Sequence, residues 1–405
     1  MLPYSPSDTQ QDIINAAISN NNVLADSVAG SGKTSTILLL AKNLNKKILV
    51  LTYNKRLKFE TKNKIKEYNI TNCNIFTYHS FCNCMYDEKC INDYGITNIL
   101  KSNNTLKKNS KFLEYNFLII DESQDMTKLY YQLVCKIYSD IQKLFKNKMQ
   151  ICIFGDRYQS IFQFNGADER YITYGDKLFD FNDLSWSQQR LNTSYRITKQ
   201  MAHSINTIFL KNNRLNAIKD IENSMNYVIC NIFDSYINTL VHDLLLTYTF
   251  DDIFILSPSM KSSNIPARSL SNYLSSCGYP VFLPNSDNDI ISDNIIKNKI
   301  TFSTFHQTKG LERKVVIVYN FDDTFYKYYD KNITNNCPNI LYVAMTRAME
   351  KIYLIHHNSN NFLPFVSSNF KDFVTNCEIG TSKHNDMNLI KVCNLTETKD
   401  TTHVI

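Results

Sequence analysis

Ala29-Gly30-Ser31-Gly32-Lys33-Thr34 is the segment on which the prediction of this chain's fold mainly rests. An apolar run, Asn22–Ala25, precedes it, and a helical pattern, Lys33–Asn43, follows it. Two glycines between a strand and a helix let backbone N–H groups approach a phosphate, and the helix N-terminus favours negative charge. The strict pattern has glycine at the position of Ser27, so a loop formed by chance is the alternative. The stretch predicts a phosphate-binding loop in an α/β domain.

The residue types of this loop indicate what it holds. Lys33 would neutralise the β and γ oxygens of a nucleoside triphosphate, and the Thr34 hydroxyl would bind Mg2+. Backbone groups of the other residues would cradle the phosphates. We therefore expect ATP and Mg2+ as ligands, held by Ala29, Gly30, Ser31, Gly32, Lys33 and Thr34.

A second apolar run, Phe117–Ile120, ends in the acidic sequence Asp121-Glu122-Ser123-Gln124-Asp125. A carboxylate at a strand end can hold Mg2+ through water, which is the role expected for Asp121. Its neighbour Glu122 would polarise the attacking water as a general base. In isolation these residues would also suit an acidic helix N-terminus.

Phosphoryl transfer also needs positive charge on the transferring group. Two arginines are candidates, Arg196 in Leu191–Arg196 and Arg347 in Leu341–Ala348. An isolated arginine is usually a surface charge, and only the surrounding sequences favour these two.

The overall pattern favours two doubly wound parallel sheets. Short apolar runs alternate with helical stretches such as 130–144, as buried parallel strands and their crossovers do. At 405 residues the chain suits two cores. The runs expected to form strands are 22–25, 47–51, 117–120, 150–154, 252–256 and 314–319. We expect two doubly wound α/β domains over 1–190 and 191–375, and a tail over 376–405.

Composition excludes several classes of protein. Charged residues make up 20% and hydrophobic ones 43%, which is typical of a globular chain. The net charge of +6 permits a polyanionic partner. The apolar runs are shorter than a membrane span and Met1 opens no signal peptide, so we expect a soluble intracellular protein without a membrane partner. The 11 cysteines lack paired spacing, which favours reduced thiols over disulfides, and the group near His79 lacks the spacing of a zinc site.

Taken together, these motifs resemble those of superfamily 1 helicases of the UvrD/Rep/PcrA group. They follow one another along the chain in the same order as in that family. Gly155–Asp168 is similar to motif III and Thr304–Glu312 to motif V, and Arg347 falls on the motif VI arginine. The resemblance implies that Gln159 couples the γ-phosphate to the nucleic acid track. It further implies an adenine contact for Gln10, adenine stacking for Tyr195, a ribose contact for Glu312 and a nucleic acid contact for His306.

Within that group, 51–55 and 77–81 look most like the F-box DNA helicase branch, although no F-box is evident. The resemblance covers residues 5 to 357. Two positions depart from the family pattern. Asn165 stands where an arginine is usual, and Tyr53 lies one place from the position of the corresponding aromatic in the bacterial enzymes.

Aromatic side chains can stack on the bases of a single strand. The expected nucleic acid contacts are Tyr53, Tyr78, His79, Phe162, Phe164 and His306. Phe162 and Phe164 alternate like a strand and would more often be core residues, but they come directly after the expected γ-phosphate sensor. Trp186 lacks such a context and is expected to pack.

The resemblance implies that both domains are RecA-like and flank an ATP cleft. It also implies an ATP-dependent motor that moves 3′ to 5′ on single-stranded DNA or at junctions with duplex. The segments 86–117 and 282–301 are too short for the accessory domains of larger relatives. We therefore expect a minimal, monomeric motor that unwinds duplex weakly by itself and has an unidentified protein partner. The competing hypotheses are an inactive nucleic-acid-binding scaffold, a P-loop enzyme acting on a small molecule, and an RNA-directed helicase.

Overall fold

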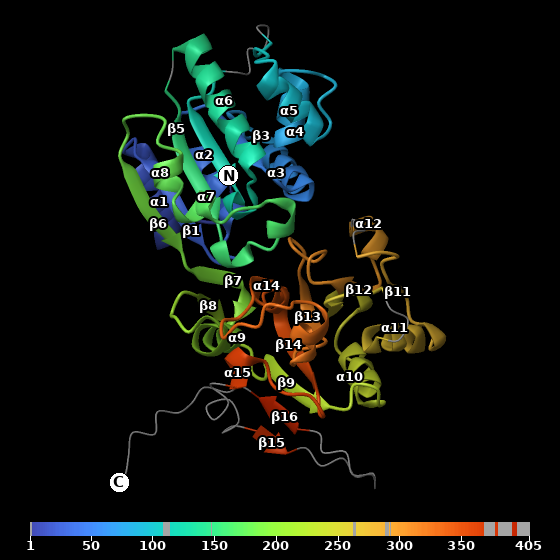
Figure 1. Ribbon diagram of the computed structural model, residues 1–405. Coiled ribbons are helices and arrows are strands. Elements are labelled where there is room, and N and C mark those ends of the chain that lie inside the picture. The colour runs from blue at the N-terminus through green and yellow to red at the C-terminus, as the bar shows by residue number, and fades with distance from the viewer. Residues whose placement is uncertain are drawn as a thin grey trace, which may run out of the picture. The chain divides into compact units, whose positions relative to one another are not determined.

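The computed structural model describes residues 2–107, 114–146, 148–261, 265–287, 291, 293–367, 377–379 and 391–394. The chain forms two compact units, unit 1 over Met1–Asn192 and unit 2 over Thr193–Ile405. Each unit has a parallel sheet of its own (Figure 1). No described helix is both long enough and apolar enough to cross a membrane.

Unit 1 is built on a six-stranded parallel sheet in the order β3-β2-β4-β5-β1-β6. Its strands are β1 (Asn22–Ser27), β2 (Ile48–Thr52), β3 (Cys73–Thr77), β4 (Phe117–Asp121), β5 (Gln150–Gly155) and β6 (Trp186–Leu191). The four strands predicted in this unit are confirmed as β1, β2, β4 and β5, with small shifts at their ends.

The crossovers of unit 1 are helical. The helices are α1 (Asp8–Ile18), α2 (Lys33–Asn43), α3 (Lys55–Glu67), α4 (Tyr78–Met85), α5 (Asp93–Lys101), α6 (Lys128–Phe145), α7 (Arg170–Thr173) and α8 (Gly175–Leu178). Short 3-10 turns are η1 (Ser123–Asp125), η2 (Arg157–Gln159) and η3 (Gln163–Asn165). The predicted helices at 33–43 and 130–144 are confirmed as α2 and α6.

The sheet of unit 1 is covered on both faces. Successive side chains of a strand point to opposite faces. In β2, Leu49 and Leu51 pack in the core with α4, α5 and α6, whereas Ile48 and Val50 pack in a second core with α1 and α2. This doubly wound arrangement explains why β2 reads as a continuous apolar run.

Unit 2 contains an eight-stranded sheet in the order β11-β12-β10-β13-β14-β9-β16-β15. The strands from β11 to β9 are parallel, and β16 and β15 join antiparallel. Its strands are β9 (Met225–Cys230), β10 (Ile253–Ser257), β11 (Val281–Phe282), β12 (Ile300–Thr304), β13 (Arg313–Val318), β14 (Ala348–His357), β15 (Cys377–Ile379) and β16 (Lys391–Asn394), beside the separate pair β7 (Thr193–Thr198) and β8 (Asn216–Lys219). The predicted strands at 252–256 and 314–319 are confirmed as β10 and β13.

Helices complete unit 2. They are α9 (Lys199–Ser204), η4 (Ile205–Leu210, a π-helix), α10 (Tyr236–Leu245), η5 (Phe250–Asp252, a 3-10 turn), α11 (Pro266–Ser276), α12 (Asp293–Ile296), α13 (Thr324–Tyr328), α14 (Asn339–Met345) and α15 (Pro364–Ser367). Most of the predicted tail, 376–405, lies outside the described residues, and its described parts are β15 and β16. The predicted α/β class, with a RecA-like parallel sheet in each unit, is confirmed.

Strand order in unit 1 determines which chain segments meet. All six strands run parallel, so their carboxyl ends lie along one edge of the sheet, where ligands of such folds bind. In register, Thr52 pairs with Asp121, and Asp26 pairs with Gly155. The segments after β3, β2, β4, β5 and β1 therefore follow one another along this edge.

Candidate nucleotide site and nucleic-acid interface

The phosphate loop of unit 1 joins β1 to α2. Gly30 has φ 71° and Gly32 has φ 83°, a left-handed conformation that glycine adopts without steric cost. Gly32 is the N-cap residue of α2, and no described side chain caps this helix start. The N–H groups of its first turn are therefore available to an anion, as in other phosphate loops.

Lys33 is held by the acidic segment that follows β4. Its Nζ lies 3.2 Å from Oε1 of Glu122, and the two side chains are only 11% and 16% exposed. Burial alone would lower the pKa of Lys33, but Glu122, Asp121 and Asp156 together outweigh burial and raise it. Lys33 is thus charged at neutral pH, and the predicted phosphate ligand and general base are ion-paired.

Glu122 adopts an unusual backbone conformation. Its φ of 53° is left-handed, which costs a non-glycine residue on the order of 1 kcal/mol. Its N–H donates to Oδ1 of Asp121 at 3.0 Å. Asp121 is buried, and burial together with the Glu122 carboxylate raises the pKa of Asp121 to about 7, despite the opposing effect of Lys33. Strain and like-charge crowding of this kind are typical of functional sites.

The residues present fit a nucleotide and Mg2+. Within the described chain, the hydroxyls of Ser31, Thr52 and Ser123 are buried without a hydrogen-bond partner. Buried polar groups are rarely left unpaired unless a ligand or water serves them. Thr34 and Asp121 supply the hard oxygen ligands that Mg2+ requires.

Gln124, which had no predicted role, links the acidic segment to the segment after β5. Its side chain is buried, with Nε2 donating to Oε2 of Glu122 at 2.5 Å and Oε1 accepting from the Asp156 N–H at 3.0 Å. Gln159 Nε2 in turn donates to Oδ2 of Asp156 at 2.9 Å. A continuous hydrogen-bonded path therefore joins Glu122 to the predicted sensor Gln159. In the sequence, the sign that could have pointed to this linking role was a glutamine inside the acidic segment.

Gly155 makes this link possible. A Cβ added at Gly155 would lie 2.7 Å from Gln124 Oε1 and 2.8 Å from Ser123 Oγ. A Cβ essentially never lies this close to a non-bonded atom, so a side chain at residue 155 would force Gln124 or Ser123 to shift.

Predicted nucleic acid contacts gather beside the path. The Tyr53 and Phe162 rings lie 6.1 Å apart between centroids, and Phe162 and Phe164 lie 6.1 Å apart. Phe164 is 70% exposed, and Tyr53 also contacts Tyr130 at 5.9 Å. Tyr53 thus joins this aromatic cluster although its place in the sequence departs from the family pattern.

Tyr78 and His79 occupy the inner side of the cluster. Tyr78 is 2% exposed and stacks in parallel on Tyr130 at 4.6 Å, which leaves no ring face for a base. Its placement therefore gives no support to a direct nucleic acid contact. His79 Nε2 lies 2.8 Å from Oδ1 of Asp93, which also accepts from the Tyr130 hydroxyl at 2.8 Å.

Gln10 is part of the phosphate-loop architecture. It is 5% exposed and forms a capping box with Ser7 at the start of α1. Its Nε2 donates to Thr36 Oγ1 at 3.0 Å and lies 3.5 Å from the carbonyl of Gly32. In this structure the Gln10 amide therefore supports the phosphate loop through Thr36.

In unit 2, two predicted nucleotide contacts hold each other. Arg196 Nε lies 2.5 Å from Oε2 of Glu312, and Arg196 Nη1 donates to the carbonyl of Thr346 at 3.2 Å. Burial would raise the pKa of Glu312, but Arg196 and Arg347 outweigh burial and lower it. Tyr195, adjacent to Arg196, is 40% exposed.

Arg347 is buried at 1% exposure. Its guanidinium donates to the carbonyls of Val343 at 2.9 Å and Leu311 at 3.3 Å, and to Oγ1 of Thr346 at 3.1 Å. These bonds fix the turn whose Thr346 carbonyl accepts from Arg196. His306 follows β12 and is half-buried.

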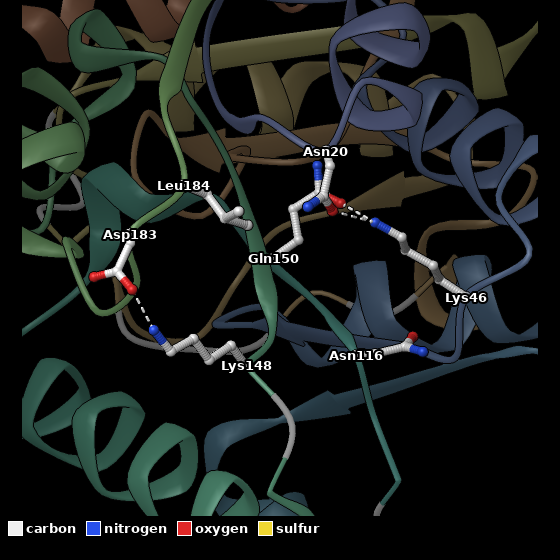
Figure 2. A pocket seen from close by; sticks show the side chains of 7 residues that line it. All are labelled: Asn20, Lys46, Asn116, Lys148, Gln150, Asp183 and Leu184. Atoms are coloured by element: carbon white, nitrogen blue, oxygen red, sulfur yellow. Dashed lines mark hydrogen bonds and ion pairs between the residues drawn. The ribbon is translucent and has the colours of Figure 1, made fainter.

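A separate hollow of about 280 Å³ lies in unit 1, beside the amino ends of β4 and β5 (Figure 2). Lys46 and Lys148 line it, but Lys46 binds Asn20 and Gln150, and Lys148 binds Asp183. Because both ammonium groups already have partners in the chain, this hollow is not a candidate ligand site.

Comparisons with known proteins agree with the phosphate loop. A family model described as "AAA domain" matches residues 10–165. No curated protein matches the chain. Among solved structures, a PRRSV helicase aligns with a TM-score of 0.40 and 11% identity over 86% of this chain. Unliganded Pif1 from Bacteroides sp. aligns with a TM-score of 0.43 and 15% identity over 87%.

The chain spans 55% of the length of the PRRSV helicase and 92% of that of Pif1. At TM-scores this low, the two likenesses do not establish a relationship. The matched segment contains the phosphate loop, the acidic segment and the path to Gln159. Residues 10–165 are therefore similar to an AAA domain, and the phosphate loop lies within the matched segment.

Proposed function

We propose that this protein is an ATP-dependent translocase or helicase that moves along single-stranded DNA. The observation that carries the proposal is the path Glu122–Gln124–Asp156–Gln159. It connects the ion pair at the phosphate loop with the segment that presents Phe162 and Phe164. A motor needs such a connection because the state of the nucleotide must change how bases are held.

The proposed chemistry is hydrolysis of the γ-phosphate. The N–H groups of 29–34 and the Lys33 ammonium bind the phosphates, and Glu122 accepts a proton from the attacking water. Thr34 and Asp121 would hold Mg2+, which neutralises charge on the phosphate oxygens when bound.

Lys33 and Glu122 must separate for this chemistry, because Lys33 then binds the phosphates and Glu122 binds the attacking water. Gln124 would transmit the movement of Glu122 to the backbone of Asp156. We further propose that Arg196 stabilises the transferring group, that Tyr195 stacks on adenine and that Arg347 positions Arg196. Movement from 3′ to 5′ is proposed from the family resemblance alone.

Steady-state ATPase assays without polymer, with single-stranded DNA and with RNA test the proposal. We expect strong stimulation by single-stranded DNA and its loss in Lys33→Ala. Lys42→Ala, an exposed change in the same helix, is the matched control. Equal turnover without polymer would exclude a motor, stimulation by RNA alone would indicate an RNA-directed helicase, and binding without turnover would indicate a scaffold.

A further inference from the structure

Helix α3 carries a stripe of lysines around one exposed aromatic ring. At 3.6 residues per turn, Lys55, Lys58, Phe59, Lys62 and Lys66 fall within an arc of roughly 100°. Lys55, Lys62 and Lys66 are exposed, and Phe59 is 66% exposed. We define these five residues as the α3 stripe.

The charge of the stripe is not neutralised locally. In the described part of the chain, no ion pair involves its lysines. The two acidic residues of the helix lie outside the arc, and Glu60 pairs with Arg56 at 2.7 Å. Burial lowers the pKa of Lys58, and the nearby charges of Lys62 and Lys55 lower it further.

The fold also fixes where the stripe begins. Asn54 caps α3 by accepting from the Arg56 N–H at 2.8 Å, so the helix starts at Lys55, two residues after Tyr53. Tyr53 lies in the aromatic cluster, 6.1 Å from Phe162. The stripe is therefore continuous along the chain with the proposed base-stacking surface.

We propose that the α3 stripe extends the single-strand track, with its exposed lysines Lys55, Lys62 and Lys66 on phosphates and Phe59 stacked on a base. The proposal rests on the proposed function for the choice of polymer. The helix rises about 16 Å over the eleven residue steps from Lys55 to Lys66. This length matches about five phosphates at a spacing of ~3.4 Å, and fewer phosphates in an extended strand. A single strand is favoured over a duplex because only unpaired bases offer a face to a lone exposed ring.

The salt dependence of binding tests the lysines. We would titrate fluorescent oligothymidylate with the unaltered chain and with the triple variant Lys55→Gln, Lys62→Gln and Lys66→Gln. Each lost phosphate contact should reduce the slope of log K against log salt by about 0.7, or about 2 in total. Between 50 and 200 mM salt the variant should therefore lose about 20-fold less affinity than the unaltered chain.

Two controls make the result specific. The triple variant Lys42→Gln, Lys101→Gln and Lys143→Gln removes the same charge from exposed positions of unit 1 and should keep the original slope. Phe59→Leu should weaken binding about five-fold or more on oligothymidylate, and should have no effect on an abasic strand. Circular dichroism melts check that each variant folds.

An unchanged slope in the stripe variant, with binding intact in the unaltered chain, would overturn this proposal and leave the proposed function standing. The proposal would also be overturned if the stripe variant reduced the salt slope equally on a duplex oligonucleotide and Phe59→Leu had no effect, because the stripe would then bind duplex phosphates. Failure of the unaltered chain to bind single strands would instead refute the proposed function.

Discussion

The ammonium of Lys33 lies 3.2 Å from the carboxylate of Glu122, so the phosphate ligand and the proposed general base neutralise each other. A triphosphate bound at 29–34 must compete with Glu122 for Lys33. Binding of the substrate would therefore release the carboxylate that is needed to activate water. This exchange predicts loss of hydrolysis for substitutions at both residues, and tighter ATP binding for Glu122→Gln.

Lys33→Ala is expected to lower kcat for ATP hydrolysis by about 10²–10³-fold, because the developing charge on the phosphate loses its nearest cation. Steady-state kinetics with and without single-stranded DNA measure the loss. Lys42→Ala should behave as the unaltered chain. Retention of full activity by Lys33→Ala would contradict the assignment of the phosphate loop.

Glu122→Gln is expected to separate binding from hydrolysis. The amide keeps the size of the side chain but loses the negative charge that holds Lys33, so binding of ATP should tighten. Without a carboxylate to accept the proton, hydrolysis should fall about 10²–10⁴-fold. Fluorescent-nucleotide titration and single-turnover hydrolysis report the two effects, and weaker binding would show that the ion pair does not compete with the phosphates.

Gly155→Ala is expected to lower the free energy of unfolding by about 1–3 kcal/mol, because the new Cβ would overlap Gln124 and Ser123. In a Gln124→Ala background the same change should cost about 1 kcal/mol less, because one of the overlapping atoms is gone. Urea unfolding of the four chains of this double-mutant cycle gives the coupling. Additive costs would mean that Gly155 and Gln124 act independently.

Arg347→Ala is expected to reduce mainly stability, whereas Arg196→Ala is expected to reduce mainly the rate of ATP hydrolysis. Arg347 is buried and bonded to two backbone carbonyls, so its removal should lower the free energy of unfolding by about 3 kcal/mol. Arg196→Ala removes an ion pair with a partly exposed glutamate and should cost at most about 1 kcal/mol. The kcat of the Arg196→Ala variant should nevertheless fall about 10³-fold or more. Thermal melts and ATPase assays on both variants check this division, which equal stability losses would contradict.

Phe164→Leu and Tyr78→Leu provide a similar contrast in the aromatic cluster. Phe164 is exposed, so its substitution should weaken binding of single-stranded DNA by about 1–3 kcal/mol and leave stability unchanged. Tyr78 is buried against Tyr130, so its substitution should lower the free energy of unfolding by about 2 kcal/mol. Fluorescence anisotropy and chemical unfolding measure the two quantities. A binding defect in stable Tyr78→Leu would restore Tyr78 as a direct contact.

The strands that the sequence predicted share one property, burial on both faces. β4 and β5 are completely buried, so each is a continuous apolar run with a polar turn at its end. β6 (Trp186–Leu191) was not predicted, because an edge strand with partly exposed positions has no such run. In unit 1 the local pattern therefore revealed the interior strands and missed the edge strands, whereas in unit 2 it also missed β12, an interior strand that is completely buried.

The phosphate loop, the acidic segment and the α/β class could be predicted from the sequence, because each depends on residue types at short spacing along the chain. Three relationships became visible only in the folded chain: Gln124 joins Glu122 to Asp156, Tyr78 is buried, and Arg196 pairs with Glu312. These relationships depend on which strands are neighbours and on how side chains pack between them. The order β2-β4-β5-β1 brings together segments that lie far apart in the chain, and this order cannot be inferred from the local spacing of residues.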